Sequence, residues 1–106
     1  LALNEQKCFA DVDSLLSKVK PDVVIVATHA PSHDEYVLKS ASAGVQAILC
    51  EKPMAVSLKQ CDAMIDECRR HGVRLAVNHQ MRFMEQYTVP KRIAYSEALG
   101  GLKSVS

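Results

Sequence analysis

The stretch Ile48-Leu49-Cys50-Glu51-Lys52-Pro53 decides how this sequence is interpreted, because an apolar run stops there at an acid, a base and a proline. A short apolar run that ends in this way is typical of a buried strand that delivers polar groups to the edge of a sheet. Proline fixes its own backbone angle and so sets the direction in which the chain leaves Lys52. Taken alone, the last three residues are explained better as two solvated loop charges before a helix-starting proline, so the flanking sequence must decide.

Before this stretch, the sequence predicts two helices and one strand. Asp11 precedes apolar residues at helical spacing and is predicted to cap a short helix that Pro21 ends. The β-branched run Asp22–Thr28 lacks polar alternation, which predicts a strand covered on both faces, as in a parallel sheet. Ser32 and Glu35 form the S-x-x-E capping-box pattern at the start of a second helix. This helix is predicted to close at Gly44, and residues 47–50 form the next strand.

After this stretch, the same alternation repeats. Ser57 and Gln60 are predicted to form another capping box, and Gly72 to close the helix before a strand over Val73–Asn78. Asp66 and Arg70 are spaced to pair along this helix, whose apolar face is marked by Leu58, Cys61, Met64, Ile65 and Cys68. A last helix is predicted from about Pro90 to Leu99, ended by Gly100-Gly101, with Leu102–Ser106 opening one more strand.

Strands and helices that alternate over such short connections predict an α/β fold with a partial doubly wound parallel sheet, Rossmann-like in topology. Ligands of such sheets bind beyond the carboxyl ends of the strands. Those ends are Thr28–His33, Glu51–Pro53 and Asn78–Arg82, and every unusual polar cluster of the chain falls in one of them. The sequence therefore predicts a ligand site along this edge.

Length and charge exclude several classes of protein. A chain of 106 residues forms one domain at most, and 48% hydrophobic with 24% charged residues is the composition of a soluble globular protein. A net charge of +1 with no Lys/Arg run longer than Arg69-Arg70 argues against nucleic acid as a partner. The apolar runs are of strand length, which argues against a membrane span, and residues 1–10 lack the pattern of a signal peptide.

The four cysteines raise the question of a metal site or a disulfide. Cys8, Cys50, Cys61 and Cys68 contain no C-x-x-C spacing, and the four histidines do not join them in a zinc-type pattern. Buried free thiols explain them better, and we expect no metal. Free thiols also suit a reducing compartment, so the cytoplasm is the expected location.

Three pieces of the sequence, taken together, resemble the Gfo/Idh/MocA family of NAD(P)-dependent oxidoreductases. They are Asp22–Thr28 with His33 five residues on, Ala43-Gly44 leading to Leu49-Cys50-Glu51-Lys52-Pro53, and the group His79, Arg82 and Phe83. Their order and spacing agree over about residues 8–106. The resemblance implies a cofactor, NAD or NADP, that lies across the strand ends.

The resemblance also implies roles for individual residues. Lys52 would be the catalytic residue, near the nicotinamide and the substrate. The family's cofactor contacts would fall on Thr28, His29, His33, Glu51, Lys52, Pro53, Gln80 and Arg82. The sequence departs from the family pattern at two of these positions, because the family usually has proline where His29 stands and asparagine where Gln80 stands.

By the same resemblance, residues 1–99 would be the later part of the NAD(P)-binding Rossmann domain and residues 100–106 the start of a C-terminal α/β substrate domain. No glycine occurs before Gly44, so the first strand and its glycine-rich phosphate loop are expected to be missing. The 106 residues alone are therefore expected to be inactive. The full-length parent is expected to form homo-oligomers, as the family commonly does.

The chemistry that this predicts is hydride transfer between NAD(P) and a sugar, polyol or related carbonyl compound. Lys52 would stabilise negative charge on the reacting oxygen or carry a proton, and Glu51 would orient this region. For His33 and His79, ordering of loop backbone and contact with ligand both remain open. Met81, Phe83 and Met84 are interpreted as packing residues.

Two other interpretations remain. A non-catalytic paralogue could have kept the sheet as a dinucleotide sensor or scaffold. An unrelated doubly wound domain, such as a receiver-like module, would need an acidic cluster at the strand ends, where Glu51 is the only acid.

Overall fold

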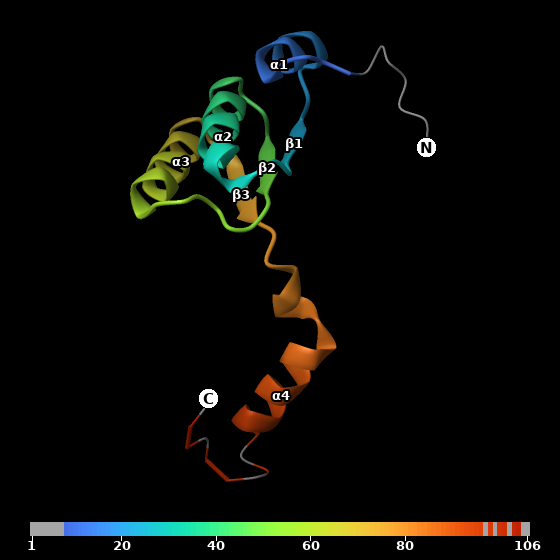
Figure 1. Cartoon of the computed structure of the whole chain (residues 1–106), viewed down its shortest axis with the longest axis vertical. Coiled ribbons are helices and arrows are strands. Elements are labelled where there is room, and N and C mark those ends of the chain that lie inside the picture. The colour runs from blue at the N-terminus through green and yellow to red at the C-terminus, as the bar shows by residue number, and fades with distance from the viewer. Residues whose placement is uncertain (1–7, 97, 99, 102, 105–106) are drawn as a thin grey trace.

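The computed structural model describes residues 8–96, 98, 100–101 and 103–104. In chain order the elements are α1 (Val12–Val19), β1 (Val23–Val26), η2 (Ala30–Ser32), α2 (His33–Ser42), β2 (Ala47–Cys50), α3 (Leu58–Arg70), β3 (Arg74–Val77), η3 (Gln80–Phe83) and α4 (Glu85–Tyr95). Figure 1 shows the sheet with α1, α2 and α3 gathered at one end of an elongated molecule, while α4 extends away from them.

The three strands form one parallel sheet in the order β1-β2-β3, which confirms the predicted α/β fold. In this register Val26 pairs with Cys50, and Cys50 pairs with Val77. The last residues of the three strands therefore lie side by side, and the three following loops leave the sheet at one edge.

One face of the sheet is covered by α2 and α3, which also pack against each other (Figure 1). Ile48 from the central strand and Met64 from α3 are 1% and 0% exposed, and each such burial stabilises the fold by roughly 1.5–3 kcal/mol. The buried hydrophobic residues form one cluster, which comprises Leu16, Val26, Val37, Ala41, Val45, Ile48, Cys50, Met64, Cys68 and Val73.

The other face of the sheet is open, so the prediction that Asp22–Thr28 is covered on both faces is wrong for the part of the chain that the structure describes. Val23 and Ile25 of β1 are 57% and 66% exposed, although their neighbours Val24 and Val26 face the helices. The continuous apolar run of β1 is typical of a strand that is buried on both faces of its sheet. In the described structure, however, α2 and α3 both pack on the same face.

Two of the three predicted N-terminal helix caps are present. The Asp11 carboxylate accepts from the Ser14 backbone N–H at 2.7 Å, and the Ser57 hydroxyl accepts from the Gln60 backbone N–H at 3.3 Å. The predicted capping box of Ser32 and Glu35 is wrong, because Ser32 ends the η2 turn with helical backbone angles and its hydroxyl donates to the His29 carbonyl.

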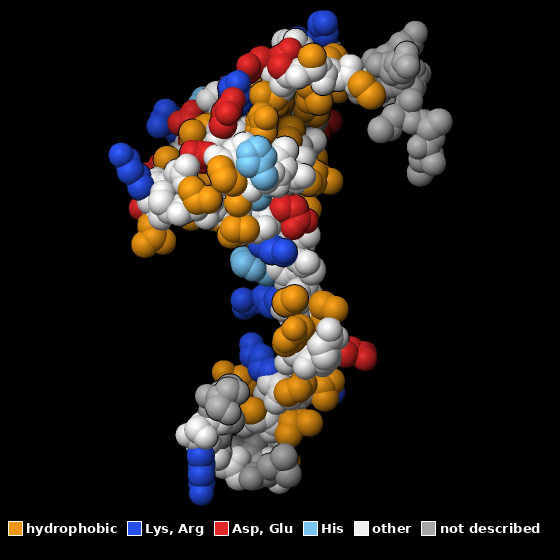
Figure 2. Space-filling view, in the orientation of Figure 1, with side chains coloured by type: hydrophobic (Ala, Val, Ile, Leu, Met, Phe, Trp, Pro, Cys, Tyr) orange, Lys and Arg blue, Asp and Glu red, His pale blue; other side chains and the backbone are white. Residues whose placement is uncertain are grey.

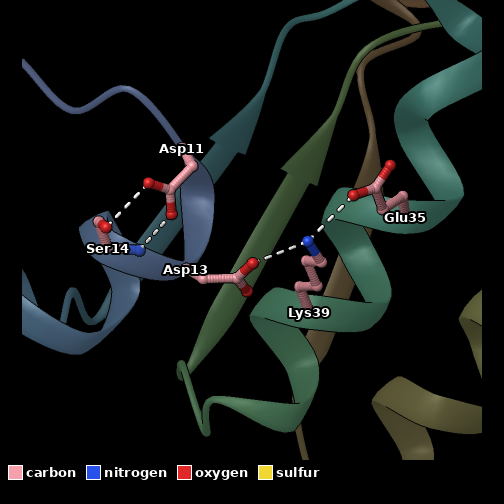
Figure 3. Close-up of polar contacts among 5 residues, drawn as sticks. All are labelled: Asp11, Asp13, Ser14, Glu35 and Lys39. Atoms are coloured by element: carbon pink, nitrogen blue, oxygen red, sulfur yellow. Dashed lines mark hydrogen bonds and ion pairs between the residues drawn. The ribbon is translucent and has the colours of Figure 1, made fainter.

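Glu35 instead pairs with Lys39, which also reaches across to α1. The Lys39 Nζ lies 3.0 Å from a Glu35 carboxylate oxygen and 2.9 Å from one of Asp13. Figure 3 shows the side chain of Lys39 between these two acids. The hydrogen bonds that Lys39 donates, first to Asp13 and second to Glu35, raise the pKa of its ammonium group above the ordinary value. The cluster is exposed to solvent, so it orients α1 against α2 and adds little to stability.

Three other predictions need correction. Asp66 pairs with Arg69 rather than Arg70, whose partner is Glu67, because side chains three residues apart are also neighbours on a helix. The last helix begins at Glu85, not near Pro90, and ends at Tyr95. Pro90 lies inside it, and its ring has no N–H to donate to the preceding turn. The strand predicted over Leu102–Ser106 falls largely outside the described residues.

The cysteines match their predicted state in part. Cys50, Cys61 and Cys68 are free thiols, and Cys50 and Cys68 are buried, whereas Cys61 is half-buried and Cys8 is exposed. Burial raises the pKa of both the Cys50 and the Cys68 thiol. Among the described residues, no group of three or more His, Cys, Asp or Glu side chains is placed to hold a metal ion.

The open face predicts self-association of the 106-residue chain when it is expressed alone, because exposed apolar strands template contact between chains. Ile25→Thr keeps a β-branched side chain but removes apolar surface, so light scattering should give a lower apparent mass for this variant. Val56→Thr changes a residue of similar exposure, 59%, outside the sheet and should have no such effect. A monodisperse monomer from the unchanged chain would contradict this prediction.

The buried side chains of β2 and α2 predict opposite effects of two substitutions on the free energy of unfolding. Ile48→Ala leaves a cavity and should lower it by about 2–5 kcal/mol. Ser40 is fully buried, and its hydroxyl has no hydrogen-bond partner within the described structure, so Ser40→Ala should raise it by about 1 kcal/mol. Urea denaturation followed by circular dichroism measures both, and a loss of stability in Ser40→Ala would reveal a partner for this hydroxyl.

Candidate functional site

The candidate site is a hollow beyond the carboxyl ends of β2 and β3, with a volume of about 470 Å³. Lys52 and Pro53 line it from the loop after β2, and His79, Gln80, Met81 and Arg82 line it from the segment after β3. Figure 2 shows Lys, Arg and His side chains gathered at this level, between the sheet and α4. Four of the predicted site residues, Lys52, Pro53, Gln80 and Arg82, are thus brought together.

The η3 turn explains how the side chains after β3 reach this hollow. The His79 backbone N–H donates to the Val77 carbonyl at 2.9 Å, and the His79 carbonyl accepts from the Arg82 N–H at 2.9 Å. Consecutive residues of the turn therefore project in different directions. Met81 is 56% exposed, Phe83 79% and Met84 39%, so these side chains do not pack into the described core, and their interpretation as packing residues stays a prediction.

Glu51 lies next to the hollow and is held by two hydrogen bonds. Its carboxylate accepts from the Asn78 side-chain amide at 2.7 Å and from the Lys52 backbone N–H at 3.3 Å. The Asn78 contact above all holds the pKa of the Glu51 carboxyl below its ordinary value, with a smaller contribution from the Lys52 N–H. Glu51 is therefore a carboxylate at neutral pH that joins the ends of β2 and β3, which suits the predicted orienting role.

Asn78 was not among the predicted site residues, although the sequence holds a signal for it. Cys50 and Val77 are partners in the sheet, so the next residue of each strand, Glu51 and Asn78, must also be neighbours. An acid and an amide at matching positions of adjacent parallel strands indicate a hydrogen bond between them.

Thr28 and His29 lie in the loop after β1 and do not line the hollow. The Thr28 hydroxyl lies 2.9 Å from that of Ser32, whose own hydrogen goes to the His29 carbonyl. Both Thr28 and His29 are exposed at the same edge of the sheet as Lys52. This loop is therefore ordered by its own hydrogen bonds and open to a ligand that runs along the edge.

His33 is the only predicted site residue that is fully buried, with 1% of its surface exposed. Its Nδ1 lies 2.9 Å from the Pro53 carbonyl oxygen, and its Nε2 lies 3.0 Å from the Thr28 carbonyl oxygen. Of the two roles open for this histidine, these contacts fit ordering of loop backbone.

Cys50 immediately precedes the site, but its side chain belongs to the buried core. Its thiol is buried and donates to the carbonyls of Glu51 at 3.4 Å and Met54 at 3.8 Å. Because burial raises the pKa of this thiol, it stays protonated and is a poor nucleophile. The hydrogen bonds to backbone oxygen instead help to shape the turn that follows β2.

Another hollow, of about 830 Å³, lies at the opposite edge of the sheet. Pro21, Asp22, Val45 and Gln46, which precede β1 and β2, line it together with residues of α1 and α2. It is larger, but ligands of parallel sheets bind at the carboxyl ends of the strands, so the smaller hollow at Lys52 is the candidate site. None of the helices in the described part of the chain is long and apolar enough to cross a membrane.

The parallel sheet and the polar strand ends define a Rossmann-like α/β domain, and comparison with known proteins shows its family. The family model described as an oxidoreductase family with an NAD-binding Rossmann fold matches residues 2–79. The chain belongs to this family, Gfo/Idh/MocA.

Several relatives are similar over most of the chain. A 2,7-anhydro-N-acetylneuraminate hydratase of Mediterraneibacter gnavus is 38% identical over 90 residues, which cover 85% of this chain and 24% of that protein. A D-apiose dehydrogenase of Paraburkholderia graminis is 36% identical over 99 residues, 93% of this chain and 26% of that protein. The chain thus spans about a quarter of the length of these relatives.

The fold is also that of solved structures. The WlbA dehydrogenase from Bordetella pertussis, solved in complex with NADH and UDP-GlcNAcA, superposes with a TM-score of 0.79 at 27% identity. The match covers 87% of this chain and 26% of that chain. A crystal structure of an oxidoreductase from Agrobacterium radiobacter with NAD+ and L-tartaric acid gives a TM-score of 0.75 at 30% identity, over 85% of this chain and 26% of that one.

The hydrogen bond between Asn78 and Glu51 predicts how the site responds to pH. The pKa of Glu51 in the folded protein is lower than its ordinary value of 4.5. The hydrogen bond therefore contributes its full stabilisation at pH values above 4.5, and this stabilisation is lost as the pH falls through the pKa of the folded protein. Asn78→Ala should therefore raise the pKa of Glu51, measured by carbon-13 NMR titration of its carboxyl group. Gln80→Ala, which leaves the link intact, is the control, and an unchanged titration in Asn78→Ala would contradict the assignment.

Proposed function

We propose that this chain is the later part of the NAD(P)-binding domain of an oxidoreductase that transfers a hydride to or from a sugar, polyol or related carbonyl compound. Residues 1–99 would belong to that domain and residues 100–106 would begin the substrate domain. The observation that carries the proposal is the convergence of Lys52, Gln80 and Arg82 on one hollow at the carboxyl edge of a parallel sheet.

The residues around the hollow fit one end of a dinucleotide. Lys52, Gln80 and Arg82 supply hydrogen-bond donors, while Pro53 and Met81 supply apolar surface. This mixture suits a flat ring that carries an amide, and a volume of about 470 Å³ accommodates such a ring with part of a small substrate. Thr28 and His29, exposed along the same edge, would contact the remainder of the cofactor.

The bound cofactor would accept or supply the hydride, and the protein would position the reactants and stabilise charge. Lys52 is exposed at the hollow, where its ammonium group would donate a hydrogen bond to the reacting oxygen. Gln80 and Arg82 would hold the ring end of the cofactor. Glu51 and His33 would act from behind, by ordering the loops that carry these groups.

The substrate class rests on the names of relatives, which include a D-apiose dehydrogenase and several inositol 2-dehydrogenases. We therefore propose a polyhydroxylated substrate, with NAD or NADP as cofactor. The full-length protein would be a homo-oligomer in the cytoplasm, where its free thiols stay reduced.

Lys52→Ala in the full-length protein tests the proposal. Turnover should fall by about 100-fold or more, because the group that stabilises the reacting oxygen is lost. Binding of NADH and NADPH, followed by fluorescence, should change far less. Lys18→Ala, which removes an exposed lysine of α1 remote from this edge of the sheet, is the matched control and should leave both measurements unchanged.

The assay should follow substrate by mass spectrometry as well as nicotinamide absorbance, because two relatives are hydratases, whose net reaction adds water. Loss of turnover with retained cofactor binding supports the proposal. A wild-type protein that binds dinucleotide, converts no sugar or polyol and is unaffected by Lys52→Ala would overturn it in favour of a dinucleotide sensor.

A further inference from the structure

His33 begins α2 and is buried beneath two of the loops at the carboxyl edge of the sheet, with 1% of its surface exposed. One ring nitrogen contacts the loop after β1, through the Thr28 carbonyl, and the other contacts the loop after β2, through the Pro53 carbonyl. These loops are separated by 20 residues or more along the chain. The imidazole therefore bridges two segments that only the tertiary structure brings together.

Both partners of the ring are carbonyl oxygens, which only accept hydrogen bonds. A neutral imidazole carries one ring hydrogen, so it donates to one of the two carbonyls at a time, and only the doubly protonated ring donates to both. In either form, Nδ1 must carry a hydrogen for the Pro53 contact to be a hydrogen bond. No other atom of the side chain is polar. The whole hydrogen-bonding capacity of His33 is thus directed at loop backbone inside the protein.

The Pro53 contact lies directly beside the site. Lys52 is held on one side by the Glu51 carboxylate, which accepts its backbone N–H at 3.3 Å and is itself anchored by Asn78. On the other side, the peptide group of Pro53 is held by His33 at 2.9 Å. Lys52 itself is exposed, so its backbone on either side, rather than packing of its side chain, sets where the ammonium group points.

We propose that His33 is a positioning residue for Lys52. Its Nδ1–H donates to the Pro53 carbonyl and thereby fixes the direction in which Lys52 enters the hollow. This inference rests on the proposed function, in which Lys52 acts on the reacting oxygen. A displacement of about 1 Å at a reacting group costs on the order of 100-fold in rate, so a backbone tether at this point is sufficient to control turnover.

Two substitutions in the full-length protein separate the contacts of the ring. Asparagine places its amide nitrogen near the position of Nδ1, so His33→Asn keeps the donor to Pro53. Glutamine reaches the position of Nε2, so His33→Gln places a donor at the Thr28 carbonyl and loses the one to Pro53. His33→Gln should lower kcat by about 10-fold or more while the KM for the dinucleotide is unchanged, and His33→Asn should stay near wild type.

The effect must pass through Lys52, which a double substitution tests. In the Lys52→Ala background, His33→Gln should cause no further loss of kcat, because the group that it positions is already gone. An equal loss in both backgrounds, or an equal loss in His33→Asn and His33→Gln, would overturn the proposal. If the wild type converts no substrate, the proposed function fails. If Lys52→Ala leaves turnover intact, the role of Lys52 fails, and with it that of His33; if Lys52→Ala abolishes turnover and His33→Gln does not affect it, only the role of His33 fails.

A measurement on the unchanged protein does not depend on how the variants fold. Long-range nitrogen-15 NMR of the histidine rings distinguishes a nitrogen that carries a hydrogen from one that does not. Nδ1 of His33 should carry a hydrogen, as the bond to Pro53 requires. A bare Nδ1 would overturn the proposal.

Discussion

Parallel pairing in register places Val26, Cys50 and Val77 side by side at one edge of the sheet, and the site depends on this alignment. Each strand ends in a loop that carries polar groups, and the loops leave the sheet at the same level. Backbone hydrogen bonds extend the alignment by one residue, because the Glu51 N–H donates to the Val26 carbonyl and the Asn78 N–H to the Cys50 carbonyl. Groups that are far apart in sequence are thereby held within reach of one ligand.

Two side chains convert this alignment into a fixed arrangement of loops. His33 joins the loops after β1 and β2 from below, and Glu51 joins the ends of β2 and β3 through Asn78. Burial of a polar group destabilises a protein unless the group is hydrogen-bonded, so contacts with backbone carbonyls are the condition for placing the buried ring of His33 beneath these loops. Lys52, between the two links, is left exposed and directed by its backbone.

Several large apolar side chains are exposed on the surface of the described chain. Val23 and Ile25 lie on the open face of the sheet, and Phe83 and Tyr95, at η3 and the end of α4, are each 79% exposed. Relatives of this chain are about four times its length. Apolar surface of this kind suits a part that is covered by further chain in a protein of that size.

The sequence by itself determined the elements whose signals are local. Apolar runs predicted β1 and β2, and Asp11 and Ser57 predicted the starts of α1 and α3. Gly44 and Gly72 were predicted to close α2 and α3, and both adopt the left-handed backbone conformation, with φ of 78° and 69°, that glycine tolerates best. The alternation of these elements predicted the parallel sheet and the edge at which Lys52 lies. Motif spacing and family resemblance predicted Gln80 and Arg82, which meet Lys52 at one hollow.

Only the tertiary structure decided which partners the polar groups find. Ser32 is a residue type suited both to capping a helix and to closing a turn, and in the structure its hydroxyl donates to the His29 carbonyl of the turn. His33 could face a ligand or the protein interior, and two carbonyls from separate loops decided for the interior. Apolar strands do not encode which face receives the helices, so the open side of β1 was also hidden from the sequence. These outcomes depend on contacts between distant segments, and a sequence pattern records only near neighbours.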